Sequence, residues 1–154
     1  MARLGFILFL LSAINGCGFV NFKDISSCNE YKELVDTTYR TKKNFLILGI
    51  NMGGNPKEFH QYAVVNEPGF GGPEVITHDS LPINSVFQIK KVLVCTNCFL
   101  DFSPRIKYLI EIKSDNNFKD YDIFLDDSFG SKQNSITSKD RVKMNPKMFE
   151  LIEQ

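Results

Sequence analysis

A regular alternation of apolar and polar residues between Ile106 and Lys113 limits the fold more than any other feature of this chain. Isoleucine or tyrosine stands at every second position from 106 to 112, whereas lysine or glutamate stands at positions 107, 111 and 113. A strand that is buried on one face and exposed on the other requires this period of two. The segment therefore predicts a half-buried β-strand.

Further strands are predicted from apolar runs of strand length that end at turn residues. In chain order they are Cys17–Ile25 (a short strand or an extended arm), Phe45–Ile50, Gln61–Val65, Glu74–His78, Phe87–Val94 and Tyr121–Leu125. Phe45–Ile50 is apolar throughout, which is typical of a central strand that is covered on both faces. With Gln61–Val65 it predicts a hairpin with a long loop.

One amphipathic helix is predicted near the N-terminus. Ser27 and Glu30 match a capping box, in which the serine and glutamate side chains satisfy backbone N–H groups at the helix start. Apolar residues then recur at helical spacing, which predicts a helix over Cys28–Arg40.

A shorter helical segment is predicted near the C-terminal end. The pair Asn145–Pro146 is typical of a helix start. Two turns over Lys147–Glu153 would direct Met148, Leu151 and Ile152 inward. Together these patterns predict the α+β class, namely an antiparallel β-sheet with one packed N-terminal helix.

The first sixteen residues have the layout of a secretory signal peptide. Arg3 is followed by the apolar run Leu4–Ala13, which is too short to span a bilayer, and small residues follow at Gly16 and Gly18. The predicted organisation is therefore a signal peptide at 1–16, removed after Gly16 or Gly18, and a single secreted, extracellular domain at 17–154.

Four cysteines indicate a disulfide-stapled domain, because disulfides persist outside the cell. The predicted disulfide residues are Cys17, Cys28, Cys95 and Cys98. Cleavage after Gly16 keeps this number even. Either each close pair forms a bridge, or crossed bridges tie the N-terminal arm to the sheet, and the crossed arrangement would restrain the unfolded chain more.

Other roles for these cysteines fit the sequence less well. A redox-active Cys95–Cys98 motif would open a helix, which Pro104 and the following β alternation oppose. A zinc ribbon would need a closer first pair than Cys17 and Cys28. A bacterial-type lipoprotein with a lipidated Cys17 is a further alternative, since Ile14–Cys17 is similar to a lipobox.

Charge and composition exclude several classes of partner. The chain holds 18 Lys+Arg and 18 Asp+Glu, and removal of the signal peptide takes away one arginine and no acidic residue. This balance predicts no nucleic-acid binding, which requires a basic surface. No second apolar run has the length of a membrane span, so none is predicted.

No catalytic or cofactor-binding motif is present, and we expect neither an enzyme nor a bound cofactor or metal. The only histidines are His60 and His78, and neither lies in a hydrolase or zinc-protease motif. The most irregular stretch is instead a candidate binding loop, since glycine and proline shape loops and loops carry function. Its residues are Pro68, Gly69, Phe70, Gly71, Gly72 and Pro73.

Within Ser85–Leu125 the sequence resembles a cystatin. The resemblance rests on Lys107–Lys113, the polar turn that follows, and Tyr121–Leu125. It implies a helix gripped by an antiparallel sheet, and inhibition of papain-like proteases. The inhibitory motifs are not present: none of the Gln-x-Val-x-Gly residues occurs at Asp101–Arg105, and the chain lacks tryptophan.

These observations predict a secreted, non-enzymatic protein that binds an unknown protein target, of an effector, venom or salivary type. Three alternatives remain: a cystatin-like protease inhibitor, the lipoprotein, and a small enzyme that uses His60 or His78.

Overall fold

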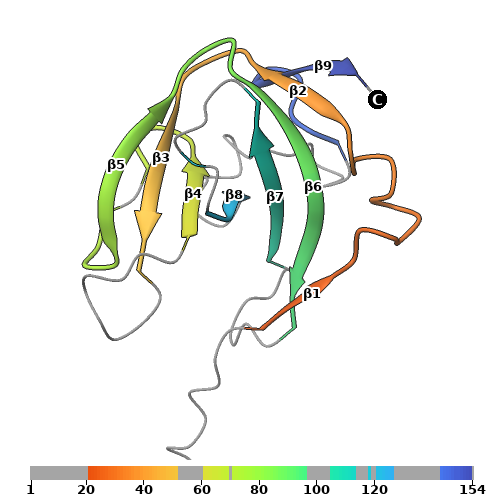
Figure 1. The fold of residues 1–154 in the computed structure, drawn as a ribbon, viewed down its shortest axis with the longest axis horizontal. Helices are drawn as coiled ribbons and strands as arrows, with labels where there is room; N and C mark the ends of the chain where they lie inside the picture. The colour runs from red at the N-terminus through yellow and green to blue at the C-terminus, as the bar shows by residue number, and fades with distance from the viewer. Residues whose placement is uncertain are drawn as a thin grey trace, which may run out of the picture.

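In the part of the chain that the structure describes, nine β-strands form one sheet (Figure 1). The structure, a computed structural model, describes residues 21–51, 61–69, 71–96, 105–113, 118, 121–126 and 143–153. The strands are β1 (Phe22–Asp24), β2 (Thr38–Thr41), β3 (Phe45–Ile50), β4 (Gln61–Val65), β5 (Val75–Leu81), β6 (Val86–Cys95), β7 (Ile106–Ile112), β8 (Ile123–Asp126) and β9 (Phe149–Glu153).

The prediction of an α+β fold with an antiparallel sheet is wrong. The described part of the chain contains no helix, and the sheet is mixed, with the order β5-β3-β4-β8-β7-β6-β2-β9 and β1 paired to β6. All neighbours are antiparallel except β4 and β8, which run parallel. The expected hairpin is confirmed, since β3 pairs antiparallel with β4, and β6 likewise pairs antiparallel with β7.

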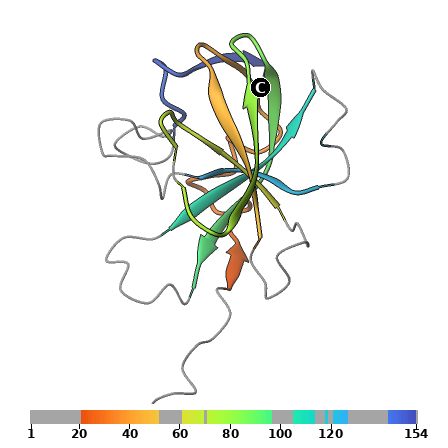
Figure 2. The ribbon, with the colours of Figure 1, turned by 90° about the vertical axis from the view of Figure 1, so that its left-hand side faces the viewer.

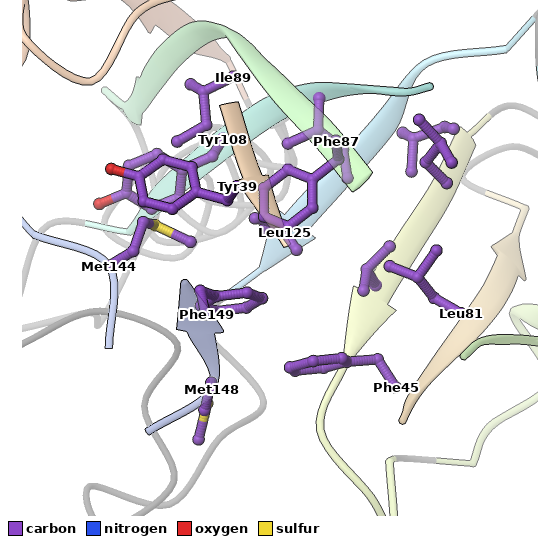
Figure 3. Packing of buried hydrophobic residues seen from close by; sticks show 14 of the residues in the cluster. Tyr39, Phe45, Leu81, Phe87, Ile89, Tyr108, Leu125, Met144, Met148 and Phe149 are labelled. Atoms are coloured by element: carbon purple, nitrogen blue, oxygen red, sulfur yellow. The ribbon is translucent and has the colours of Figure 1, made fainter. Parts of the chain in front are cut away.

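The sheet is strongly twisted and rolled, so that strands from its opposite ends approach each other. In the view of Figure 2 the strands cross one another at steep angles. Phe45 of β3 stacks on Phe149 of β9, with ring centroids 5.1 Å apart. Strands that are far apart in the strand order therefore enclose one main core (Figure 3).

The alternation along β7 has the predicted consequence. All four alternate side chains, those of Ile106, Tyr108, Ile110 and Ile112, are buried, and Tyr108 is completely inaccessible. Burial of one face of a strand removes apolar surface from water and stabilises the fold by about 25 cal/mol per Å². The period of two thus placed β7 correctly in the core.

The main core draws on most strands and on the turn segments between them. Its fully buried aromatic residues are Phe45, Phe87 and Tyr108. The ring of Phe149 meets that of Phe87 edge-on, with centroids 5.5 Å apart. Figure 3 shows Leu81 and Leu125 beside these rings, so the core spans the sheet from β5 to β9.

A second apolar cluster lies on the opposite face of β3 and β4. It consists of the buried side chains of Leu48, Ile50, Ala63 and Val65. Because Phe45 and Ile47 of the same strand belong to the main core, β3 is covered on both faces, as its apolar sequence predicts.

The predicted helix over Cys28–Arg40 is wrong, and its place is taken by successive turns followed by β2. The N–H groups of Tyr31 and Leu34 donate to carbonyls three residues earlier, and a single bond, from Lys32 N–H to Cys28 O, has the four-residue spacing of an α-helix. The turns end at Asp36, which has a φ of 62° and donates its N–H to Ile89 O at 2.7 Å. Hydrogen bonds to β6 therefore replace the expected helical bonds.

The prediction of two helical turns over Lys147–Glu153 is also wrong, because only a single turn forms before the chain becomes a strand. Asn145 begins that turn as expected: its Oδ1 accepts from Lys147 N–H at 3.0 Å, and its carbonyl accepts from Met148 and Phe149. From Phe149 the chain becomes β9, because the free side of β2 supplies backbone partners for it.

The disulfide-stapled framework is not found as predicted. Cys28 is a free, exposed thiol, so every pairing that includes it is wrong. The other described cysteine, Cys95, ends β6, and no disulfide joins it to Cys28. Cys17 and Cys98 lie outside the described residues. Cys28 lies in the turn segment that replaced the expected helix, which leaves its side chain facing solvent.

Candidate functional site

The edge strand β5 is the first component of a candidate binding surface. Among the strands that the structure describes, β3 is the only one that pairs with β5, so one long side of β5 has no partner strand. Its residues from Thr77 to Ser80 are all exposed. An unpaired edge presents a row of backbone N–H and C=O groups that can accept another strand.

Two backbone hydrogen bonds show which β5 groups point outward. Asn51 N–H donates to Glu74 O, so the backbone of Asn51 faces β5. Tyr62 N–H donates to Asp122 O, so the backbone of Tyr62 faces β8 and not β3. Since backbone groups alternate between the two sides of a strand, residues 45, 47 and 49 bond to β5, opposite residues 81, 79 and 77. The backbone groups of His78 and Ser80 therefore face the unpaired side.

The side chains of β5 divide between the two faces of the sheet. Asp79 is paired with Ile47, a main-core residue, so the Asp79 side chain lies on the core-facing side. Thr77 is paired with Gly49, and Gly49 with Tyr62, so these residues form one row on that side. His78 is paired with Leu48 and lies on the opposite face.

Three aromatic residues form a compact group beside this row. Tyr62 meets Phe118 edge-on with centroids 4.8 Å apart, and it meets Tyr121 in the same way at 5.6 Å. Phe118 is buried, whereas Tyr121 is 46% exposed. Burial, then the nearby Tyr121 and then the charge of Asp79 raise the pKa of the Tyr62 phenol above its usual value. Asp79 lies on the same face of the sheet as Tyr62, in the adjacent row.

A shallow hollow adjoins the aromatic group at the end of β5. It has a volume of about 280 Å³ and is lined by Ser80, Leu81, Pro82, Ile83, Asn84, Ser85 and Phe118. Pockets that enclose small molecules are on the order of 300–1,000 Å³ and bury most of their ligand. A small, open hollow with the 51% exposed Ile83 at its rim suits one protruding side chain better than a whole cofactor.

Hydrogen bonds from β2 and the following turn hold the wall of this hollow. Thr41 Oγ1 donates to Pro82 O at 2.8 Å and accepts from Ser85 N–H at 3.0 Å. Ile83 N–H donates to Asn44 Oδ1 at 2.8 Å. Thr41 is completely buried, so its two hydrogen bonds fix the wall to the body of the protein.

We call the unpaired side of β5, the hollow, Asp79, Tyr62 and Tyr121 together the β5 surface. The predicted binding loop lies between β4 and β5, and thus leads directly into it. Pro68, Gly71 and Pro73 are exposed, Gly69 and Gly72 are half-buried, and Phe70 lies outside the described residues.

Gly69 packs against the sheet instead of standing at an exposed tip. A Cβ atom at this position would lie 2.9 Å from Leu46 Cδ1 and 3.5 Å from Val65 Cγ2. This part of the loop therefore lies over the second apolar cluster. Its role as a binding loop remains a prediction.

Potential metal ligands do not cluster in the described residues. No group of three or more potential metal ligands occurs among them. His78 is exposed on β5, and His60 lies outside the described residues. In the part of the chain that the structure covers, no helix is long and apolar enough to cross a membrane.

Sequence patterns alone did not identify the residues of the β5 surface. Glu74–His78 was predicted as a strand, but nothing local indicates that Phe118 and Tyr62 lie beside it. The four consecutive polar residues Thr77–Ser80 were the available signal, since such a run is typical of an exposed edge strand.

Comparison with protein-family models, curated proteins and solved structures found no match. The segments that resemble a cystatin do pair antiparallel, as β7 and β8. The helix that this resemblance implies is absent from the described residues. Kinship with the cystatins stays a prediction.

Proposed function

We propose that this chain is a secreted, non-enzymatic protein that acts by binding another protein through the β5 surface. The observation that carries the proposal is the combination of a strand edge that no described strand pairs with and two exposed side chains, Ile83 at the hollow and Tyr121 beside Tyr62. Protein-binding sites combine apolar or aromatic anchors with polar surroundings.

The shape of the surface supports a protein ligand over a small molecule. The hollow is open and small, and Thr41 holds its wall in place. A preorganised wall lowers the entropy cost of binding, because few groups must be ordered on contact. Secretion, with removal of residues 1–16, rests on the signal-peptide pattern.

The proposal is tested by selecting a phage-displayed random peptide library on the purified protein. We expect enriched peptides whose affinity falls on the order of tenfold in Ile83→Asp, because a charge at the rim would oppose burial of an apolar ligand group. The matched control is Ile152→Asp, which changes an isoleucine of similar exposure on β9. We expect the control to bind like the wild type.

Two results would refute the proposal. Failure to enrich any peptide would do so, as would enriched peptides that bind Ile83→Asp and the wild type equally. Inhibition of papain by micromolar protein would instead support the alternative that the cystatin resemblance implies.

A further inference from the structure

We infer that the β5 surface recognises an extended peptide, which adds to β5 as an antiparallel strand and places a cationic side chain opposite Asp79. This inference rests on the proposed function and specifies the mode of binding and the chemistry of the partner. Strand addition gives affinity through main-chain hydrogen bonds and specificity through alternate side chains.

The backbone of β5 is suited to strand addition. The N–H and C=O groups of His78 point away from β3, as the hydrogen-bond pattern of β3 and β4 shows. Ser80 N–H also points to this side, where the Asp79 carboxylate already accepts its hydrogen bond at 2.7 Å, so the outward N–H of His78 is the donor offered to an added strand. Val75–Leu81 contains neither lysine nor proline, two residues that commonly protect an edge strand, and its protecting features are a bulge opposite Gly49 and Ile50 and the charge of Asp79.

The charge of Asp79 selects the kind of partner. Asp79 is exposed, and none of the ion pairs between described residues involves it. In an antiparallel pair, the side chain opposite Asp79 would have its Cβ about 4.5–5.5 Å away, within reach of an arginine or lysine contact. A second copy paired around this residue would instead bring two aspartates together, which is unfavourable.

The tyrosines on the same side favour the same partner. Tyr62 lies on the core-facing side with Asp79, in the row next to that of Asp79 and Ile47, and the ring of Tyr121 meets that of Tyr62. The faces of aromatic rings attract cations, and guanidinium groups also stack on them. In addition to the cationic side chain, the same peptide can place an apolar side chain in the hollow at Ile83.

The backbone part of the inference is tested by comparing His78→Pro with His78→Ala. Proline removes the outward N–H group without removing a hydrogen bond to β3, whereas alanine keeps that N–H and removes only the imidazole. For peptides selected on the wild type, we expect a loss of affinity on the order of tenfold in His78→Pro and little change in His78→Ala.

A second measurement covers the case in which His78→Pro does not fold. The selected peptides are synthesised with single N-methyl groups at successive positions and titrated against the wild-type protein. Strand addition predicts that binding is lost at alternate positions, since only every second N–H faces β5. Uniform tolerance of N-methylation would overturn the inference.

The charge part is tested with Asp79→Asn, which keeps an Oδ1 acceptor for Ser80 N–H. We expect the selected peptides to carry arginine or lysine, and Asp79→Asn to weaken them about twofold to fivefold, a loss typical of an exposed ion pair. When the cationic residue of the peptide is changed to glutamine, its affinity for the Asp79→Asn variant should not fall further. Enrichment of peptides without a cation would overturn the choice of partner.

These outcomes separate the two proposals. Peptides that depend on Ile83 but not on the His78 N–H or on Asp79 would leave the proposed function in place and refute the mode of binding. A lack of any selected peptide would refute both.

Discussion

Gly69 illustrates how a single backbone conformation supports this fold. Its φ of 74° lies in the left-handed region, and its Cα lies close to the side chains of Leu46 and Val65. Glycine adopts this conformation without the steric cost that a Cβ imposes. Gly71, two residues later in the same loop, is exposed, and a Cβ there would meet no atom within 4 Å.

Gly69→Ala is expected to lower the free energy of unfolding by about 1–2 kcal/mol, the usual cost of the left-handed conformation for an L-residue. Gly71→Ala is the control and should change it by less than about 0.5 kcal/mol. Urea denaturation of both variants provides the measurement. Equal stability of the two variants would contradict the left-handed conformation and close packing described for Gly69.

Lys107 shows what alternation cannot predict at the level of one residue. It lies on the face of β7 opposite to the main core, yet only 7% of it is exposed. Its ammonium group lies 4.7 Å from the ring centroid of Phe22 and 5.4 Å from that of Phe124. Lys107, which the alternation assigns to the exposed polar face, is therefore buried in cation–π contacts with rings from β1 and β8.

At the level of elements, the C-terminal segment shows how tertiary partners override a local helix signal. Asn145 and Pro146 start one turn as predicted, but pairing with β2 then makes Phe149–Glu153 a strand. The helical prediction directs Leu151 inward, whereas in the strand Leu151 is 54% exposed and Phe149 is 3% exposed. Phe149 gains ring contacts with Phe45 and Phe87 in this arrangement.

Alanine substitutions in β9 distinguish the strand from the helix. Phe149→Ala should destabilise the protein by about 3–5 kcal/mol, because it removes a buried ring and leaves a cavity. Leu151→Ala should cost less than about 0.5 kcal/mol, because an exposed side chain loses little contact. Thermal unfolding monitored by circular dichroism measures both. The reverse order of effects would support a helix with Leu151 inward.

At the level of the whole molecule, the roll of the sheet joins its two ends without a disulfide from Cys28. β6 binds β7 along one side and both β1 and β2 along the other, so one long strand joins the N-terminal arm to the sheet. Phe45 and Phe149 then bring the two ends of the sheet together. With Cys28 free, no bridge from the turn segment contributes to this arrangement.

Alkylation of the folded protein with iodoacetamide, followed by peptide mass spectrometry, tests the state of Cys28. We expect Cys28 to be modified without denaturant or reductant, since its thiol is free and exposed. The intact mass of the secreted product also identifies the mature N-terminus predicted after Gly16 or Gly18. Modification of Cys28 only after reduction would restore the predicted disulfide.

The sequence by itself determined most strands and their buried faces. The period of two at Ile106–Ile112 and the apolar run at Phe45–Ile50 report local burial directly, and both hairpins join segments that are consecutive strands in the chain. Only the tertiary structure decided the parallel pairing of β4 with β8, the strand character of β9 and the free state of Cys28. It also brought Phe118 against Tyr62, which lies in the row beside that of Asp79. These features depend on which distant segments supply hydrogen bonds and apolar contacts, and no local pattern of residues contains that information.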